Sequence, residues 1–275
     1  MINFNGELVH EENIKLSIHN RGFKYGDGIF ETIKIVNKKV VFWEDHYFRL
    51  MASMLRMKIP MEFTLEFLEQ EILKTVAVQS EAVSFRVRLN VYRKDGGLYT
   101  PKTNKIDYLI EVKENTYKTK EVYTVDVFKD FYNYSGLLST IKTNNRMLNT
   151  LASIFAKEND LDNCVLINER KGVVEVANGN IFVLKGNIIK TPALTEGCIK
   201  GIARQKVIEI IAKNKEFTLE QTTISPFEIQ KADEVFITNA IMGVQPITNY
   251  KKKKFTVDFS SKIAKSLKVL EVTSA

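Results

Sequence analysis

Residues 169–204, ERKGVVEVANGNIFVLKGNIIKTPALTEGCIKGIAR, constrain the fold more than any other segment of the chain. Two turn-forming sequences, NERKG and KGN, lie at or within this segment. Short apolar runs flank the first at residues 164–167 and 173–176, and the second at residues 181–184 and 188–190. Runs of this length and composition, separated by turn residues, predict antiparallel hairpins. The segment therefore predicts two successive hairpins and a loop, followed by a helix over 203–213 whose apolar residues share one face.

The N-terminal part of the chain predicts a mixture of strands and helices. Two apolar runs, at 29–36 and 39–43, flank Asn37-Lys38 and predict a hairpin. The helix expected after it has one apolar stripe at helical spacing, formed by Tyr47, Leu50, Met51, Met54 and Leu55. Arg49 lies off this stripe, and Pro60 ends the helix. The pattern then predicts a helix over 64–78 and strands over 83–92 and 106–112.

A polar stretch, ENTYKTKE, divides the chain, and we predict a linker at 115–125. A smaller N-terminal α/β domain would cover 1–114, and a larger C-terminal domain would cover 126–275. In the second domain, apolar residues on one face predict a helix over 145–158. Ser225 and Glu228 form a capping box sequence, which predicts a helix start before a strand at 235–237. The predicted fold class is mixed, with α+β and α/β elements in two domains.

Composition excludes several classes of protein. No apolar run approaches the roughly 18 residues of a membrane span, and the N-terminus lacks a signal-peptide pattern, so we expect a cytoplasmic protein that binds no membrane. The net charge is +7, but the basic residues are dispersed apart from Lys251 to Lys254, which predict a solvated hairpin turn rather than a nucleic-acid surface. Two cysteines and three histidines give no metal-binding pattern, so no metal is expected.

The sequence Gly26-Asp27-Gly28 suggests a dinucleotide-binding loop at first sight. Such a loop needs a third glycine and a helix that starts at the phosphate, whereas a β-branched run, IFETIKIV, follows here. We therefore interpret the two glycines as a turn.

The order and spacing of several further residues are specific. Glu175, Asn180-Ile181-Phe182, Ile189-Lys190-Thr191 and residues 199–204 follow the class IV aminotransferase signature. The likeness continues through RGFKYGDGIFET, the HYFRL helix, Lys142 and EVFITNAIMGVQPI. The chain thus resembles fold-type IV pyridoxal phosphate enzymes. The resemblance implies pyridoxal 5'-phosphate as cofactor, a D-amino-acid-aminotransferase-like fold with a pseudo-barrel in the C-terminal, cofactor-binding domain, and a homodimer acting on a small molecule.

The resemblance assigns the two groups that act on the cofactor ring. Lys142, in STIKTNNRMLN, is implied as the catalytic lysine that holds the cofactor covalently. Residue chemistry alone does not choose among the many lysines of this chain. Glu175 is implied as the partner of the ring nitrogen, because a nearby carboxylate stabilises the protonated ring that serves as an electron sink.

The cofactor phosphate needs donors. Gly201 and Ile202 begin a predicted helix, and backbone N–H groups at a helix start favour an anion. Thr238 can add a hydroxyl, and Arg49 a forked guanidinium. Asn239, next to Thr238, is assigned to the same cofactor site. Asn180 is expected to order the loop after Glu175, and Cys198 is expected to pack. Neither is assigned a catalytic role.

The resemblance leaves the reaction open, because fold-type IV enzymes include aminotransferases and lyases. Thr238-Asn239-Ala240-Ile241-Met242 and KTNNRML resemble the 4-amino-4-deoxychorismate lyases more than the aminotransferases. We therefore predict a lyase that releases 4-aminobenzoate and pyruvate, a step toward folate, with Lys142 as the base. A branched-chain or D-amino-acid aminotransferase, which would use the same lysine, stays the alternative.

Overall fold

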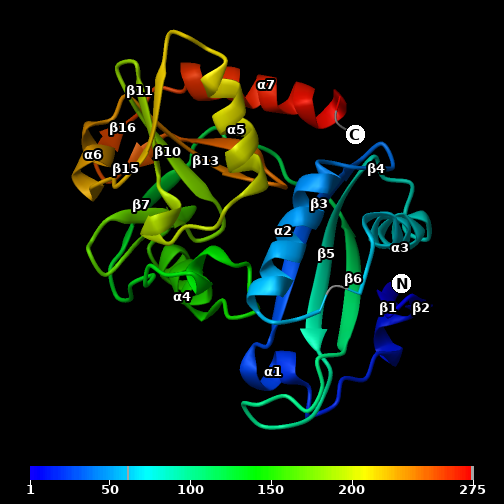
Figure 1. Cartoon of the computed structure of the whole chain (residues 1–275). Helices are drawn as coiled ribbons and strands as arrows, with labels where there is room; N and C mark the ends of the chain where they lie inside the picture. Colours follow the sequence, from blue (N-terminus) through cyan, green and yellow to red (C-terminus); the bar gives the residue numbers. More distant parts are fainter. Residues whose placement is uncertain (61, 274–275) are drawn as a thin grey trace. The chain divides into compact units, whose positions relative to one another are not determined.

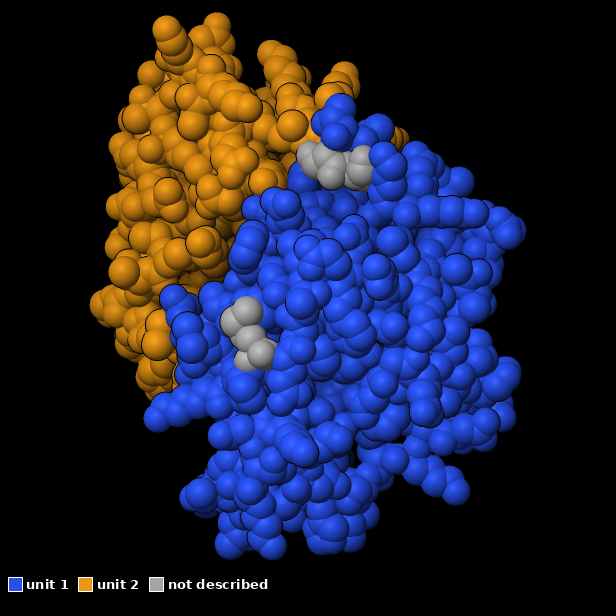
Figure 2. Space-filling view, turned by 45° about the vertical axis from the view of Figure 1, so that its right-hand side comes forward, with its two compact units in different colours: residues 1–116, 142–145, 271–275 blue, residues 117–141, 146–270 orange. Residues whose placement is uncertain are grey.

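The computed structural model describes residues 1–60 and 62–273, which fall into two units. Unit 1 comprises the described residues of Met1–Thr116 together with Lys142–Asn145 and 271–273, and unit 2 comprises Tyr117–Ile141 and Arg146–Leu270. Figure 2 colours the two units. The predicted linker at 115–125 contains the change of unit, but it also contains Tyr123, which is buried in unit 2.

Unit 1 is built on a six-stranded antiparallel sheet with the strand order β2-β1-β6-β5-β3-β4 (Figure 1). Its strands are β1 Ile2–Phe4, β2 Glu7–Val9, β3 Gly28–Val36, β4 Lys39–Val40, β5 Ser84–Arg93 and β6 Ile106–Glu114. Its helices are α1 Arg21–Tyr25, α2 Trp43–Arg56 and α3 Leu65–Ala77. Helix α2 packs on β3, and α3 packs on β6.

The two faces of this sheet differ in chemistry. Side chains alternate between the faces of a strand, so Ile29, Glu31 and Ile33 share one face of β3, and all three are buried. The opposite face of β3 carries Phe30 and Thr32, which lie opposite Asn90 and Arg88 of β5. One face is therefore an apolar core with a single buried acid, and the other face carries polar groups.

The predicted hairpin at Asn37-Lys38 is confirmed, and both residues have positive φ, as a tight turn between β3 and β4 requires. The second strand is shorter than predicted, since β4 ends at Val40 and residue 43 begins α2. Phe42 has a φ of 52°, which breaks the extended conformation. Two acids in the first turn then favour the helix start.

Unit 2 contains two five-stranded sheets, with the orders β12-β11-β10-β13-β14 and β16-β15-β7-β8-β9. The strands of the first sheet are β10 Asn180–Lys185, β11 Ile188–Pro192, β12 Thr218–Thr222, β13 Glu234–Asn239 and β14 Gly243–Ile247. Those of the second are β7 Thr124–Phe128, β8 Asn163–Ile167, β9 Val173–Val176, β15 Asn249–Tyr250 and β16 Lys253–Lys254. Both predicted hairpins, β8–β9 and β10–β11, are confirmed as antiparallel.

Apolar side chains from both sheets of unit 2 form one core, to which Val125, Val165, Ile181 and Val235 belong. Four helices complete the described elements: α4 Met147–Glu158, α5 Ile202–Ala212, α6 Pro226–Lys231 and α7 Asp258–Thr273. The predicted fold class, mixed α and β with several sheets, is confirmed. None of the helices in residues 1–60 and 62–273 is both long and apolar enough to cross a membrane.

Several local predictions for unit 2 can be compared with the structure. The capping box of Ser225 and Glu228 is present at the start of α6. The four-lysine run forms the β15–β16 hairpin, with Lys251 at a φ of 54°. Helix α7 begins shortly after this run, at Asp258. Strand β12 and helix α7 were not predicted.

Candidate active site

Lys142 lies beside the first residues of β3 in unit 1. The Phe30 N–H donates to the Lys142 carbonyl at 2.9 Å, and the Asn144 N–H donates to the Gly28 carbonyl at 2.9 Å. Between them, Thr143 forms an antiparallel bridge with Ile29. The Lys142 Nζ lies 4.4 Å from the centroid of the Phe30 ring. Backbone pairing on both sides therefore fixes the position of this half-buried lysine.

Gly26 and Gly28 allow this approach. Gly26 ends α1 with a φ of 62°, and a Cβ placed there would lie 2.3 Å from Asn145 Oδ1. A Cβ at Gly28 would lie 2.5 Å from Asn144 Nδ2. The turn predicted for this motif is confirmed, and its glycines provide space for the segment that follows Lys142.

The residues after Lys142 differ from the prediction. Helix α4 begins at Met147, so Asn145 and Arg146 precede the helix that was expected to start at 145. Arg146 Nη2 donates to the Ile141 carbonyl at 2.6 Å. The pairing of the Lys142 segment with β3 explains the late helix start, because residues 142–144 already have an extended partner.

Arg49, predicted as a phosphate ligand, belongs to a buried ionic cluster in unit 1. Its Nε and Nη2 donate to the two carboxylate oxygens of Glu31 at 2.8 and 2.5 Å. His46 Nδ1 lies 2.8 Å from the same carboxylate. Glu31 and His46 are each 1% exposed. Sequence reasoning missed both partners, although Glu31 stands among buried isoleucines in the alternating pattern of β3.

Burial and the neighbouring groups determine the protonation states of Glu31 and His46. Burial raises the pKa of Glu31, but the Arg49 charge and the hydrogen bonds from His46 and Arg49 outweigh it and lower that pKa to about 2. Burial lowers the pKa of His46, opposed by its hydrogen bond to Glu31. At neutral pH the cluster is therefore an ionised Glu31–Arg49 pair with a neutral imidazole. Two of the five guanidinium donors orient Arg49 on Glu31.

Glu175, predicted to face the cofactor ring, lies in β9 of unit 2 and is 5% exposed. Its Oε2 accepts the Ile199 N–H at 3.0 Å and lies 3.4 Å from Asn180 Nδ2. Asn180 also donates to the Ile199 carbonyl at 2.8 Å. These contacts join β9, β10 and the loop before α5. Asn180 therefore holds the loop before α5, whereas the sequence led us to expect that it orders the loop after Glu175.

Gly201 is the N-cap of the eleven-residue helix α5, and no side chain caps it. A Cβ at Gly201 would lie 2.0 Å from Asn180 Oδ1, so only glycine fits. The N–H groups in the first turn of a helix have no partner within the helix. The Gly201 N–H donates to the Ile199 carbonyl at 2.9 Å. The backbone donors at the start of α5 therefore begin at Ile202, beside Asn180.

Thr238 completes this group from the neighbouring strand. It lies in β13 directly opposite Asn180 and is fully buried. Its Oγ1 is a buried atom without a hydrogen-bond partner in the described part of the chain. The Asn239 side chain donates to the Asn178 carbonyl at 2.9 Å and accepts the N–H groups of Ile241 and Met242 at 3.0 and 2.8 Å. Asn239 thus shapes the turn that follows Thr238.

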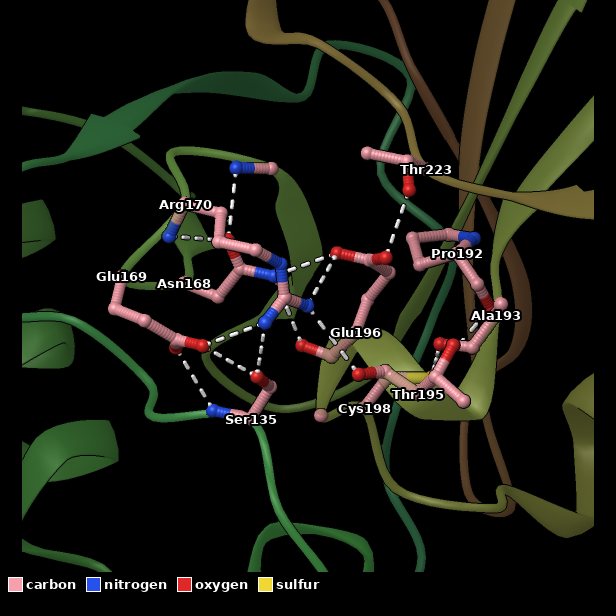
Figure 3. A network of polar contacts seen from close by, with 12 residues as sticks. Ser135, Asn168, Glu169, Arg170, Pro192, Ala193, Thr195, Glu196, Cys198 and Thr223 are labelled. Carbon is pink, nitrogen blue, oxygen red and sulfur yellow. Dashed lines mark hydrogen bonds and ion pairs between the residues drawn. The ribbon is translucent and has the colours of Figure 1, made fainter.

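A second polar network fixes the loop that leads to Gly201 (Figure 3). Glu196 accepts Thr223 Oγ1 at 2.7 Å, Asn168 Nδ2 at 2.7 Å and Arg170 Nη2 at 3.2 Å. Burial raises the pKa of Glu196, but these three hydrogen bonds and the Arg170 charge bring it below its ordinary value. The carboxylate therefore stays ionised and anchors the loop three residues before Ile199.

Cys198 and Arg204 are buried next to this loop. Burial raises the pKa of the Cys198 thiol to about 12, so the cysteine packs, as expected. Arg204 Nη2 donates to the Pro192 carbonyl and to Gln221 Oε1, both at 2.9 Å, while its Nε is a buried atom without a partner among the described residues. Sequence reasoning missed Arg204 because arginines on helices are usually solvated.

The residues of unit 2 fit a phosphate-bearing cofactor with a ring nitrogen. Thr238 Oγ1 is a buried hydroxyl that lacks a partner among residues 1–60 and 62–273, and no side chain caps the start of α5 in those residues. A phosphate monoester accepts from both kinds of donor. Glu175 is a buried carboxylate, the kind of group that a protonated ring nitrogen requires.

The family model described as amino-transferase class IV matches residues 28–250. The chain belongs to this family. Class IV amino-transferases depend on pyridoxal 5'-phosphate, which agrees with the cofactor expected from the sequence. The matched range includes every residue that the sequence assigned to the site.

Relatives in the family differ in activity. D-alanine aminotransferase of Bacillus licheniformis is 27% identical over 266 residues, which cover 90% of this chain and 87% of the relative. Aminodeoxychorismate lyase of Vibrio harveyi is 23% identical over 243 residues, which cover 87% of this chain and 89% of the relative. The family thus includes both reaction types that the sequence left open.

A solved structure shares the fold over nearly the whole chain. The branched-chain aminotransferase of Thermoproteus uzoniensis, solved with norvaline, has a TM-score of 0.92 and 22% identity. The match covers 99% of this chain and 95% of that one. The likeness extends the sequence match beyond residues 28–250 to the whole arrangement of helices and strands.

Proposed function

We propose that this protein is a pyridoxal phosphate-dependent 4-amino-4-deoxychorismate lyase, which forms 4-aminobenzoate and pyruvate on the way to folate. The observation that carries the proposal is the turn after Thr238. Its sequence resembles that of the lyases, and Asn239 accepts the N–H groups of Ile241 and Met242. Asn239 therefore fixes the turn by accepting these two N–H groups, and an asparagine at this position is typical of the lyases.

In this proposal the bound cofactor supplies an electron sink for the carbon that loses its proton. Lys142 would hold the cofactor, and its amine would take the proton from the substrate carbon that bears nitrogen. Its fixed backbone supports this role, because the hydrogen bonds Phe30 N–H to Lys142 and Asn144 N–H to Gly28 hold residues 142–144 against β3. A base positioned within reach of that proton contributes a factor of about 100 to 10,000.

The remaining predicted residues bind and orient. Glu175 accepts a hydrogen bond from the protonated ring nitrogen. Because Glu175 is buried, this interaction is stronger than it would be in water. Ile202 and Thr238 donate to the phosphate, and Gly201 lets the backbone approach it. Arg49 is assigned to the phosphate from the sequence alone, and within unit 1 Glu31 fixes its guanidinium.

The test is a product assay with purified holoenzyme and aminodeoxychorismate. We expect 4-aminobenzoate and pyruvate in equal amounts, without any keto-acid acceptor. Product formation that depends on an acceptor would refute the lyase. Lys142→Ala serves as the control, and it should lose both the product and the visible absorbance band of the covalently bound cofactor.

The second candidate is an aminotransferase acting on a D-amino acid or a branched-chain amino acid. It is favoured by the higher identity to D-alanine aminotransferase, 27% against 23% for the lyase relative. A screen of D-alanine and L-leucine with 2-oxoglutarate distinguishes the two. Transfer of the amino group at a rate above that of 4-aminobenzoate formation would replace the lyase by this candidate.

We also propose a homodimer. Four large apolar side chains are more than half exposed within eight residues of the segment before Lys142, namely Phe131, Tyr134, Leu137 and Leu138. Such a concentration is unusual for a solvated surface. Light scattering during size-exclusion chromatography should give twice the mass of the chain, and a monomer at micromolar concentration would contradict this part of the proposal.

A further inference from the structure

The sequence Asn-Gly occurs twice in the chain, at Asn5-Gly6 and at Asn178-Gly179. Both pairs lie in tight turns, the first between β1 and β2 and the second between β9 and β10. Asparagine is one of the chemically labile residues of proteins. It is most labile before glycine, because glycine has no side chain to shield its backbone nitrogen, which can then attack the carbonyl carbon of the asparagine side chain.

Asn178 is exposed, and only one of its two amide atoms is held. Its Oδ1 accepts Asn163 Nδ2 at 2.8 Å. Asn163 is 3% exposed and its own Oδ1 accepts the Ala177 N–H at 3.2 Å, so its donor stays directed at Asn178. A donor at this oxygen stabilises the negative charge that develops there during the attack. Asn178 Nδ2, the nitrogen that must leave, makes no hydrogen bond within residues 1–60 and 62–273.

Asn5 is also exposed, but both ends of its amide are held. Its Oδ1 accepts the Tyr108 N–H at 2.8 Å, and its Nδ2 donates to Asp107 Oδ1 at 2.8 Å. Loss of Nδ2 from Asn5 therefore breaks a hydrogen bond that has no counterpart at Asn178. The two pairs share their sequence and their exposure, and they differ in the hold on the leaving nitrogen.

The glycine of the second pair is required by the packing against β13. A Cβ at Gly179 would lie 2.6 Å from the Thr238 carbonyl oxygen, closer than a side chain can approach. The Gly179 N–H donates to the Val176 carbonyl at 3.4 Å, a long hydrogen bond that holds the nitrogen weakly. The contact that brings this turn against Thr238 thus also imposes the residue that makes Asn178 labile.

We propose that Asn178 is a site of spontaneous deamidation, and that the reaction weakens the cofactor site of unit 2. The Gly179 nitrogen forms a bond to Cγ of Asn178 and gives up its proton, while the bond from Cγ to Nδ2 breaks and Nδ2 leaves with that proton as ammonia. Water then opens the cyclic succinimide at either carbonyl. One product has aspartate at position 178, and the other has isoaspartate, in which the main chain runs through the former side chain.

The isoaspartate product changes the turn that joins β9 to β10. The main-chain carbonyl of Asn178, which accepts Asn239 Nδ2 at 2.9 Å, becomes part of a free carboxylate. The main chain also becomes longer in a turn where the Val176 N–H donates to the Gly179 carbonyl at 2.8 Å. Both changes loosen residues next to Thr238. The effect on the cofactor rests on the proposed function, which assigns Thr238 to the phosphate, whereas the deamidation itself does not.

Peptide mapping by mass spectrometry tests the modification. Purified holoenzyme is incubated at neutral pH, and conversion is followed at Asn178 and at Asn5. In the folded protein Asn178 should convert roughly tenfold faster, the value of the one hydrogen bond that differs. In urea the two rates should approach each other, because neither side chain is then held. Equal rates in the folded protein, no conversion at Asn178, or the same ratio in urea would overturn the proposal.

Equilibrium dialysis of the aged protein against pyridoxal 5'-phosphate tests the consequence. The deamidated fraction carries an added negative charge and is separated by ion exchange. Its cofactor affinity should be roughly tenfold below that of the unaged protein, as expected for the loss of one hydrogen bond. Asn178→Asp has the charge but an ordinary main chain, and should lose less.

Asn178→Gln is the matched control for ageing. Glutamine keeps the amide but reacts much more slowly with the next backbone nitrogen, so this variant should keep its cofactor affinity through the same incubation. An aged wild type with unchanged affinity, or an equal loss in Asn178→Gln, would show that deamidation does not weaken the site. Neither measurement uses turnover, so an absence of 4-aminobenzoate would refute the lyase and leave this inference standing.

Discussion

Unit 2 holds two buried polar clusters that differ in one respect. In the cluster of Figure 3, Glu196 receives hydrogen bonds from three side chains, and Thr223, one of these donors, has its hydroxyl satisfied. In the cluster around Gly201, Thr238 Oγ1 is buried without a partner among the described residues. The first cluster is complete within the chain. Under the proposed function, a ligand that accepts from Thr238 would complete the second cluster.

This difference separates residues that build the loop from residues that bind. A buried polar group without a partner costs about 1–3 kcal/mol. Thr238 carries this cost within the described residues, whereas the Thr223 hydroxyl donates to Glu196. Unsatisfied buried groups tend to occur at functional sites, where a bound molecule offsets the cost. Substitutions in the two clusters should therefore affect different measurements.

The largest expected effect is on catalysis, from Glu175→Gln. The variant removes a buried negative charge that the proposal places against the ring nitrogen, so kcat should fall about 100- to 1000-fold, the range for a preorganised charged group. The glutamine keeps the size of the side chain, and cofactor content by absorbance should stay near that of the wild type. An unchanged kcat would mean that Glu175 belongs with Glu196 among the structural groups.

The next effect is on stability, from Glu196→Ala. The change leaves Asn168 and Thr223 without their acceptor, so the free energy of unfolding in urea should fall by about 2–3 kcal/mol. Arg170 contributes little to this figure, because its side chain is 52% exposed. The kcat of the folded, cofactor-saturated variant should stay within a few-fold of the wild type. A selective loss of kcat at unchanged stability would contradict the comparison.

A third substitution, Thr238→Val, should separate affinity from stability. The cofactor affinity should fall by roughly tenfold, the value of one hydrogen bond. The free energy of unfolding of the cofactor-free protein should not fall, because valine removes a hydroxyl that has no partner there. Equilibrium dialysis and urea denaturation measure the two quantities.

Thr191→Val is the control for this experiment. Thr191 is also fully buried, but its Oγ1 donates to the Ile181 carbonyl at 2.9 Å. It should lose about 1 kcal/mol of stability while cofactor affinity is unchanged. If the two threonine variants behave alike, the missing partner of Thr238 has no functional meaning.

The parts of the fold that could be predicted from sequence are those with local causes. The β10–β11 hairpin and the capping box at Ser225 depend on residues a few positions apart, and both are present. Helix α7 was missed because its start depends on Glu234, which accepts the N–H groups of Phe259 and Ser260 from 25 and 26 residues away. Capping by a residue so far away in the sequence leaves no periodic pattern.

The candidate site divides in the same way. The motif residues Glu175 and Gly201 could be selected because their spacing follows a family pattern. The pairing of Lys142 with β3 joins segments more than 100 residues apart, and no local rule predicts it. Glu31 had a signal, since it occupies a regular position in an alternating strand, but alternation does not say whether a charge finds a partner. That depends on tertiary packing.

The smallest expected effect concerns the buried cluster of Glu31, His46 and Arg49 in unit 1. It is a change of the free energy of unfolding with pH. His46 is neutral in the fold because burial lowers its pKa below the ordinary 6.5. The Arg49 charge also lowers this pKa, whereas Glu31 and Asp45 raise it. The unfolded chain then binds a proton that the folded chain does not. The free energy of unfolding should therefore decrease below pH 6.5, by up to about 1.4 kcal/mol per pH unit, until the folded pKa is reached.

Urea denaturation between pH 7 and pH 5 checks this expectation. Glu31 contributes little slope in this range, because its folded pKa of about 2 and its ordinary value of 4.5 both lie below pH 5. His46→Asn keeps a donor for Glu31 but does not titrate, so its stability should change less with pH than that of the wild type. His19→Asn alters an exposed ring and should leave the slope as it is. Equal slopes for the wild type and His46→Asn would mean that folding does not lower the pKa of His46, and would contradict this expectation.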